Sequence, residues 1–308
     1  MKIAVMATGG VGGYFGANLA KAGHEVSFIA RGRHLDTICK DGLKVESPNG
    51  NIHLKSTVAT DNPADIGPVD VVIFAVKLAD MEPAAEACRP LLRDGTAVIP
   101  FLNGVDAPET LVRVLGPEYA CGGVAYISAL ISAPGCIRQV GEFARLVFGE
   151  IDGRRSKRLQ AFETACADSG INHLYSDDID VALWEKFSVL VPMSGITAGA
   201  RCPIGPIRAE PLGRKVFKAA MAEVIAVGKA RGIALPDDLM ERQLHFFNGL
   251  PDEMKASMLV DLEAGKALEA PWLSGAVTRM GREAGVATPV NDTLYAILQP
   301  YAAGTLLP

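Results

Sequence analysis

The hydrophobic and polar positions follow different patterns in the two parts of the chain. Up to about residue 175, short runs are apolar at nearly every position, as is typical of strands buried on both faces of a parallel sheet. From Asp177 onward, apolar residues recur with the 3.6-residue period of helices. The pattern predicts an α/β domain over residues 1–175, an all-α domain over residues 176–308 and an active cleft between them.

The same patterns predict individual elements. Strands are expected at 2–6, 25–30, 69–76 and 97–101, and apolar stretches at 124–131 and 145–148 are expected to extend their sheet. Alternating residues at 42–46 and 51–55 flank SPNG at 47–50 and predict a hairpin. Helices are expected at 14–21, 79–92 and 152–169, and in the second domain at 181–191, 211–231, 236–247, 257–266 and 271–283.

A glycine-rich turn, ATGGVGG at residues 7–13, joins the first strand to the first helix. Strand, turn, helix and second strand fit within about thirty residues, which is the context of a dinucleotide-binding fingerprint in a Rossmann-type domain. The residues expected to bind the pyrophosphate are Thr8, Gly9, Gly10, Val11 and Gly12. Ala7 stands where the fingerprint has its first glycine, and an alanine can form the turn only if its φ stays negative.

The end of the second strand indicates which dinucleotide is bound. An acidic residue there would bind the ribose hydroxyl of NAD, whereas an arginine accommodates the phosphate of NADP. The strand continues into Arg31 and Arg33, and no acid follows until Asp36. We therefore expect NADP(H), with Arg31 on the phosphate. The alternative is that both arginines are solvated loop charges.

Composition and charge exclude several classes of function. A net charge of −5 without a basic tract argues against a nucleic-acid partner. The six cysteines have no C-x-x-C spacing and the five histidines form no ligand pair, so no metal site is expected. No signal peptide or long apolar run is found, and a cytoplasmic protein without a membrane partner is expected.

Four polar residues are candidates for chemistry in the cleft. Lys77 and Asn103 follow predicted strands, and the carboxyl ends of parallel strands face the ligand. Lys186 lies among apolar residues of the first helix of the second domain, where it could protonate a carbonyl oxygen as hydride reaches the carbon. Glu269 stands before a predicted helix start. The ordinary alternatives are strand-end polar residues, a solvated lysine and a first-turn acid favoured by the helix dipole.

Together these motifs resemble the ketopantoate reductase (2-dehydropantoate 2-reductase) family over nearly the whole chain. The resemblance depends on the glycine turn with Arg31, AVK at 75–77, FLNG at 101–104, LWEK at 183–186 and SMLVD at 257–261 with the downstream Glu269. It implies an NADPH-dependent reduction of ketopantoate to (R)-pantoate, in pantothenate and coenzyme A biosynthesis.

The resemblance also implies roles for individual residues. Lys186 would be the general acid, and Glu269 would bind and orient the substrate hydroxyl. Asn103 would contact the lysine and the substrate, and Ser257 the substrate carboxylate. Lys77 would lie at the boundary between cofactor and substrate, so that Lys77, Asn103 and Glu269 also count as cofactor-binding positions.

The chain departs from the family pattern at three positions. The family usually has asparagines four and eight residues after the lysine, where this chain has Leu190 and Ser194, and another asparagine at the position of Ile204. Ser194 is kept as a predicted substrate-binding residue. Two alternatives stay open: a reductase of a different 2-oxo acid, and a non-catalytic NADP sensor, which would need neither Lys186 nor Glu269. The sequence leaves a homodimer open as well.

Overall fold

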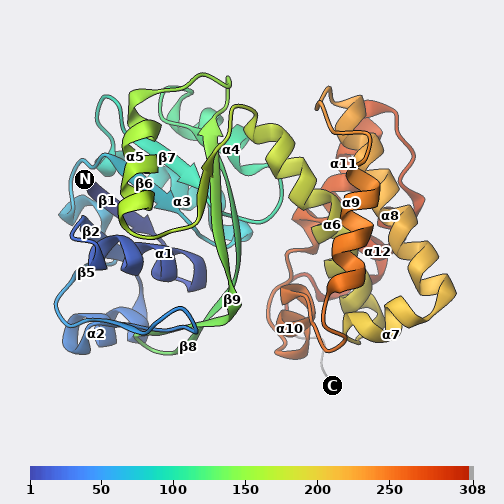
Figure 1. Ribbon diagram of the computed structural model, residues 1–308, viewed down its shortest axis with the longest axis horizontal. Helices are drawn as coiled ribbons and strands as arrows, with labels where there is room; N and C mark the ends of the chain where they lie inside the picture. The colour runs from blue at the N-terminus through green and yellow to red at the C-terminus, as the bar shows by residue number, and fades with distance from the viewer. Residues whose placement is uncertain (305–308) are drawn as a thin grey trace. The chain divides into compact units, whose positions relative to one another are not determined.

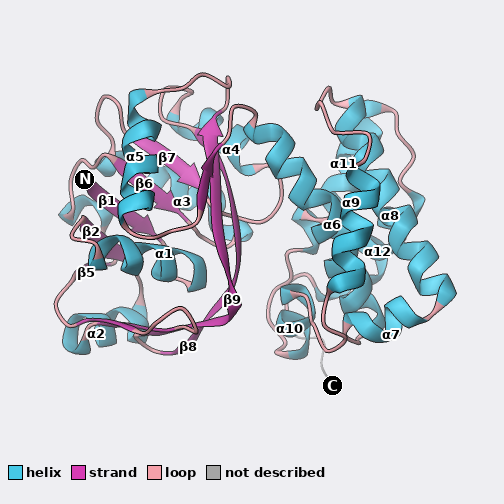
Figure 2. Cartoon of the chain, viewed as in Figure 1, coloured by secondary structure: helices cyan, strands magenta, loops and turns pink. Residues whose placement is uncertain are grey.

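The computed structural model describes residues 1–304, which form two compact units (Figure 1). The first unit contains residues 1–102 and 106–182, and the second contains Asn103–Val105 and the chain from Leu183 onward. Strands occur in the first unit, and the second is helical (Figure 2). An α/β unit followed by an all-α unit is the predicted fold class, which is therefore confirmed.

A five-stranded parallel sheet forms the centre of the first unit. Its order is β5-β2-β1-β6-β7, and all neighbouring strands are parallel. The strands are β1 (Lys2–Met6), β2 (Glu25–Ile29), β5 (Val58–Thr60), β6 (Val71–Phe74) and β7 (Ala97–Pro100). Strands β6 and β7 are fully buried, as predicted, whereas the unpredicted edge strand β5 is short and only partly buried. The winding reverses between β1 and β6, where a ligand normally binds in this topology.

The apolar stretches at 124–131 and 145–148 do not extend this sheet, so that prediction is wrong. They belong to two long antiparallel strands, β8 (Cys121–Ala133) and β9 (Cys136–Glu150), in a second sheet. The remaining strands of this sheet are β3 (Leu43–Glu46), β4 (Ile52–Leu54) and β10 (His173–Tyr175). The first part of β9 is mostly exposed and mixes apolar with polar residues, so it gave no continuous apolar signal. The predicted hairpin is confirmed as β3 and β4.

Helix α1 (Gly10–Lys21) packs between the two sheets, contacting β1 and β2 on one side and β3, β4, β8 and β9 on the other. Other helices of the first unit are α2 (Gly32–Asp41), α3 (Met81–Ala87), α4 (Ala107–Leu115) and α5 (Lys157–Asp168). The predicted helix over 79–92 is interrupted after α3, because a separate 3₁₀ turn containing Pro90 follows it. The helix predicted from residue 152 begins later, because the Ser156 hydroxyl caps α5 by accepting from the Leu159 N–H.

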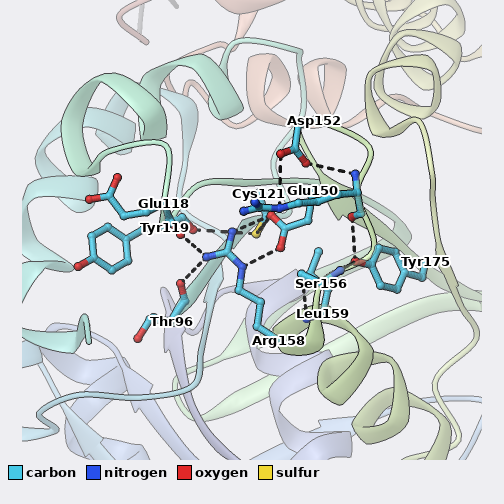
Figure 3. Close-up of polar contacts among 11 residues, drawn as sticks. Thr96, Glu118, Tyr119, Cys121, Glu150, Asp152, Ser156, Arg158, Leu159 and Tyr175 are labelled. Carbon is cyan, nitrogen blue, oxygen red and sulfur yellow. Dashed lines mark hydrogen bonds and ion pairs between the residues drawn. The ribbon is translucent and has the colours of Figure 1, made fainter. Parts of the chain in front are cut away.

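A buried ion pair attaches α5 to the sheets (Figure 3). The Arg158 guanidinium donates to both carboxylate oxygens of Glu150 at 2.7 Å, and it also donates to the carbonyl oxygens of Thr96 and Glu118. Burial alone would raise the pKa of Glu150, but the hydrogen bonds from Arg158 and Ser156 outweigh burial and hold the pKa below its usual range. The adjacent Cys121 thiol is buried, which raises its pKa. These partners satisfy one another, and we assign the cluster a structural role.

The second unit packs around α6 (Ile179–Ala200). This helix is apolar on nearly every side, as is typical of a buried helix. Around it lie α7 (Ile204–Ala209), α8 (Pro211–Ala230), α9 (Leu239–Gly249), α10 (Ser257–Glu263), the 3₁₀ turn η4 (Ala270–Trp272), α11 (Ser274–Ala284) and α12 (Pro289–Leu298). No helix in the described part of the chain has the length and apolarity needed to cross a membrane.

Candidate active site

The glycine loop (residues 7–13) joins the end of β1 to the start of α1. The Thr8 N–H and the Thr8 hydroxyl both donate to the Ile29 carbonyl oxygen at the end of β2, at 2.8 and 3.0 Å. Thr8 is therefore buried and fixed, while Gly9 and Gly10 stay partly exposed. Ala7 keeps its φ outside the left-handed region, so its methyl group does not prevent the turn.

The loop fits a dinucleotide pyrophosphate. A Cβ at Gly10 would lie 2.2 Å from the Ala129 carbonyl oxygen, so packing requires a glycine there, but a Cβ at Gly9 would meet no atom within 4 Å. Gly9 caps α1 without a side-chain hydrogen bond, and the first turn of α1 has no acidic residue. The N–H groups and the positive dipole end of α1 therefore lie beside open space, where they can receive an anion.

Arg31 is the residue that the sequence predicts to bind the additional phosphate of NADP. It is the N-cap residue of α2, directly after β2, and its side chain is exposed. No carboxylate within residues 1–304 pairs with its guanidinium, which leaves the charge available for a phosphate. Lys77 follows β6 as predicted and is also exposed.

The second unit brings three predicted site residues into one hydrogen-bonded line. The Lys186 Nζ of α6 donates to the Asn103 side-chain oxygen at 3.1 Å, and the Asn103 amide nitrogen donates to the Glu269 carboxylate at 3.1 Å. Asn103 reaches this position because the next residue, Gly104, has a φ of +80°, and a Cβ there would lie 3.3 Å from the Trp272 carbonyl oxygen. The asparagine thus joins a cation to an anion.

This line has the electrostatics of an acid–base site. Burial lowers the pKa of Lys186 to about 8, and the negative charge of Glu269 opposes part of that shift. At neutral pH the ammonium is still mostly protonated, yet it releases its proton far more readily than a surface lysine. The Glu269 side chain forms no cap bond to η4, although Glu269 is the N-cap residue of that turn. Its hydrogen bond goes to Asn103 instead.

The other predicted substrate residues are not among the three that form this hydrogen-bonded line. Ser257 is the exposed first residue of α10. Ser194 is fully buried, and its hydroxyl has no hydrogen-bond partner among the described residues. Leu190 lies one turn after Lys186 on the same face of α6, partly buried against the core, and Ile204 is a core residue.

Sequence reasoning missed one residue beside the glycine loop. His34, in the first turn of α2, contacts the Thr8 carbonyl oxygen through Nε2 at 2.9 Å. No motif or spacing in the sequence indicates this contact, because it depends on how α2 returns towards the loop.

The comparisons with known proteins agree with this architecture. The family model described as Ketopantoate reductase PanE/ApbA matches residues 3–153, and the model of its C-terminal part matches residues 178–302. The chain is 31% identical to the uncharacterized oxidoreductase YkpB of Bacillus subtilis, over 98% of this chain and 99% of that protein. It is 30% identical to the 2-dehydropantoate 2-reductase of Mesorhizobium japonicum, over 98% of both chains.

A solved structure extends the similarity to three dimensions. The 2-dehydropantoate 2-reductase of Geobacter metallireducens GS-15 superposes with a TM-score of 0.91 at 31% identity, covering 97% of this chain and 99% of that one. Both family models, the full-length relatives and the shared fold lead to one conclusion: the chain belongs to the ketopantoate reductase family of dinucleotide-binding oxidoreductases.

Proposed function

We propose that the chain reduces 2-dehydropantoate to (R)-pantoate with NADPH, a step of pantothenate and coenzyme A biosynthesis. The observation that carries the proposal is the line of Lys186, Asn103 and Glu269, in which a lysine with a pKa of about 8 is hydrogen-bonded to an oriented amide. A carbonyl reduction needs such a proton donor, because the oxygen gains negative charge as the carbon accepts hydride.

The glycine loop and Arg31 are the groups that would hold the cofactor. The start of α1 would bind the pyrophosphate, and the exposed Arg31 guanidinium would bind the additional phosphate of NADP. NADPH, when bound, supplies the hydride that reduces the substrate's C2 carbon.

Lys186 completes the reaction on the oxygen. Its ammonium donates a proton to the carbonyl oxygen, so that the C=O double bond becomes a CH–OH group, and the neutral amine then regains a proton from water. Asn103 accepts a hydrogen bond from the ammonium through its side-chain oxygen and donates one to Glu269 through its amide nitrogen. We assign the Glu269 carboxylate to the substrate's hydroxyl group and the exposed Ser257 to its carboxylate.

Leu190 favours a second candidate function, the reduction of a 2-oxo acid with an apolar side chain. Leu190 shares the Lys186 face of α6, one turn further along. A leucine offers no hydrogen bond to a substrate hydroxyl, and a site without such partners discriminates only weakly in favour of a hydroxylated substrate.

One panel assay separates these functions. The purified protein is incubated with NADPH and, in turn, ketopantoate, 2-oxoisovalerate and phenylglyoxylate, and NADPH oxidation is followed by absorbance. We expect the highest kcat/KM with ketopantoate. A higher value with either apolar acid would replace ketopantoate by the second candidate. NADPH binding without turnover of any 2-oxo acid would support a sensor and overturn both reductase proposals.

A substitution tests the role of Glu269 within the same assay. Glu269→Ala leaves the substrate hydroxyl unpaired, which costs about 1–3 kcal/mol, or roughly 5- to 150-fold in kcat/KM. The loss is expected with ketopantoate and not with 2-oxoisovalerate, which lacks the hydroxyl. Equal losses on both substrates would remove the hydroxyl-binding role.

A further inference from the structure

We propose that His34 is a positioning residue that fastens the Arg31 end of α2 to the glycine loop and thereby maintains the preference for NADPH over NADH. The inference rests on the proposed use of NADPH. It adds to that proposal a residue that would act on the cofactor only through others.

Both ring nitrogens of His34 are occupied, and their partners determine the tautomer. The Gly135 N–H can only donate, and it lies 3.0 Å from His34 Nδ1, so Nδ1 must be the unprotonated acceptor. The Thr8 carbonyl oxygen can only accept, and it lies 2.9 Å from Nε2, so Nε2 must carry the hydrogen. The neutral ring with hydrogen on Nε2 satisfies both bonds. Burial lowers the pKa of His34, against the opposing effect of the Thr8 bond, which agrees with a neutral ring.

The two partners belong to different parts of the first unit. Thr8 is in the glycine loop and is itself bonded to the end of β2. Gly135 is in the turn between β8 and β9, which Figure 1 shows reaching the neighbourhood of α2. Its φ of +71° and the 2.6 Å between an added Cβ and the Thr37 methyl group show how closely this turn approaches α2. His34 therefore links α2 to both the glycine loop and the β8–β9 turn.

Helix α2 depends on these bonds because its apolar packing is slight. Among its residues, Ile38 is the buried one, and Leu35 packs against the core partly buried. The chain enters α2 through Gly32, which has a φ of +54°, and a Cβ added there would meet no atom within 4 Å, so open space lies on that side of the residue after Arg31. His34 is then the side chain that fixes the first turn, and with it the distance between Arg31 and the pyrophosphate end of the loop.

The test measures dinucleotide affinity directly, by calorimetric titration of the full chain with NADPH and with NADH. His34→Phe keeps the ring and removes both hydrogen bonds, His34→Asn keeps an acceptor for Gly135 but is too short to reach Thr8, and His34→Gln offers one donor and one acceptor. The matched control is His53→Phe, because His53 bonds the Asp41 carbonyl oxygen at the other end of α2 at 2.8 Å. Melting curves establish that each variant is folded.

We expect His34→Phe and His34→Asn to raise the Kd for NADPH roughly tenfold and the Kd for NADH less than about threefold, as loss of an ordered hydrogen bond predicts. His34→Gln should recover most of the affinity, and His53→Phe should match the wild type. In an Arg31→Ala background, His34→Phe should have no further effect on NADPH, because both changes remove the same contact.

Three results would overturn the inference: unchanged NADPH affinity in folded His34→Phe or His34→Asn, equal weakening of both dinucleotides, or additive losses in the double variant. Failure of the proposed function would look different, since the wild type itself would then bind NADPH no better than NADH.

Discussion

The groups that we propose to face the ligands are of opposite kinds in the two units. In the first unit the groups are mostly backbone N–H groups from one continuous loop, residues 7–13. In the second they are three side chains, and the residues joined by each hydrogen bond are 83 and 166 positions apart in sequence. A site made of backbone N–H groups requires residues without large side chains. A site made of side chains requires particular functional groups from elements that are far apart in the sequence.

The two kinds of site also differ in electrostatics. The dipoles at the start of α1 carry no titratable proton and give the same field at every pH. The Lys186 ammonium titrates at a pKa of about 8, because burial disfavours its charged form. The first unit is therefore suited to holding a cofactor, and the second to moving a proton. The predictions below test this division.

The largest expected effect comes from removing the proton donor. Lys186→Met should lower kcat by roughly 10²- to 10⁴-fold, the usual contribution of a positioned acid. The Kd for NADPH should stay unchanged, because the glycine loop is intact. Stopped assays of turnover and calorimetric titration with NADPH measure the two quantities on the same preparation.

The same variant should be more stable than the wild type. The pKa of Lys186 in the folded protein, about 8, lies below that of an unfolded lysine, so at pH 7 the buried ammonium destabilises the fold, and the penalty fades as pH rises from about 8 to about 10.4. Methionine should raise the free energy of unfolding at pH 7 by on the order of 1–3 kcal/mol. Lys229→Met, which removes an exposed pair with Asp237, is the control and should not do so. If Lys186→Met kept the turnover of the wild type, Lys186 would not be the proton donor.

Arg31 tests whether the first unit needs any side chain for binding. Loss of a charge-assisted phosphate contact costs about 1.5–3 kcal/mol, so Arg31→Ala should raise the KM for NADPH roughly 10- to 100-fold. The KM for NADH should hardly change. Arg33→Ala is the matched control, two residues further on. If Arg31→Ala weakened both cofactors equally, Arg31 would have no phosphate role.

The sequence predicted the first kind of site more completely than the second. Strand, glycine turn and helix are adjacent in the chain, and β1 has the bounds that the apolar run predicts. The loop's contact with Ala129 could not be predicted, because the exposed first part of β9 has no continuous apolar run and the second sheet was therefore not predicted. The role of His34 could not be predicted for the same reason, since one of its partners lies in the turn between β8 and β9.

The side-chain cluster was predicted through resemblance and not through spacing. Nothing local connects Asn103 to Lys186 or Glu269, and each taken alone has an ordinary interpretation. The Glu269 carboxylate bonds Asn103 and does not cap the turn that it precedes, which favours a role in the site over an ordinary helix-start acid. Only the packing of η4 and of the segment Asn103–Val105 against α6 brings the three together.

Substitutions of Gly10 and Gly9 distinguish the role of the glycine loop in packing from its role in ligand binding. Gly10→Ala would force a methyl group against the Ala129 carbonyl oxygen, and such overpacking should lower the free energy of unfolding by about 1–3 kcal/mol. Gly9→Ala meets no atom, so its melting temperature should equal that of the wild type while its methyl group obstructs the approach of the pyrophosphate. Melting curves and NADPH titrations of both variants test this. A stable Gly9→Ala variant that binds NADPH normally would contradict the assignment of the pyrophosphate to this surface.

The smallest expected effect is a shift in a pH profile, and it tests whether the second unit works through the charge of Lys186. The protonated ammonium is the active form in reduction, so kcat/KM for the 2-oxo acid should fall as pH rises through about 8. Asn103→Asp places a carboxylate beside Nζ, which stabilises the ammonium and should move this fall to higher pH by roughly 1–2 pKa units. The matched control is Asn248→Asp, which adds the same charge at an exposed position of α9 and should leave the profile in place.

Asn103→Asp should also lower kcat, because a carboxylate cannot donate to Glu269 as the amide does. The position of the fall and the height of the profile therefore report different properties, the first the charge of Lys186 and the second the hydrogen bonds of Asn103. A profile that loses height without moving would mean that a group other than Lys186 sets the fall, and the second unit would then hold its ligand through hydrogen bonds alone.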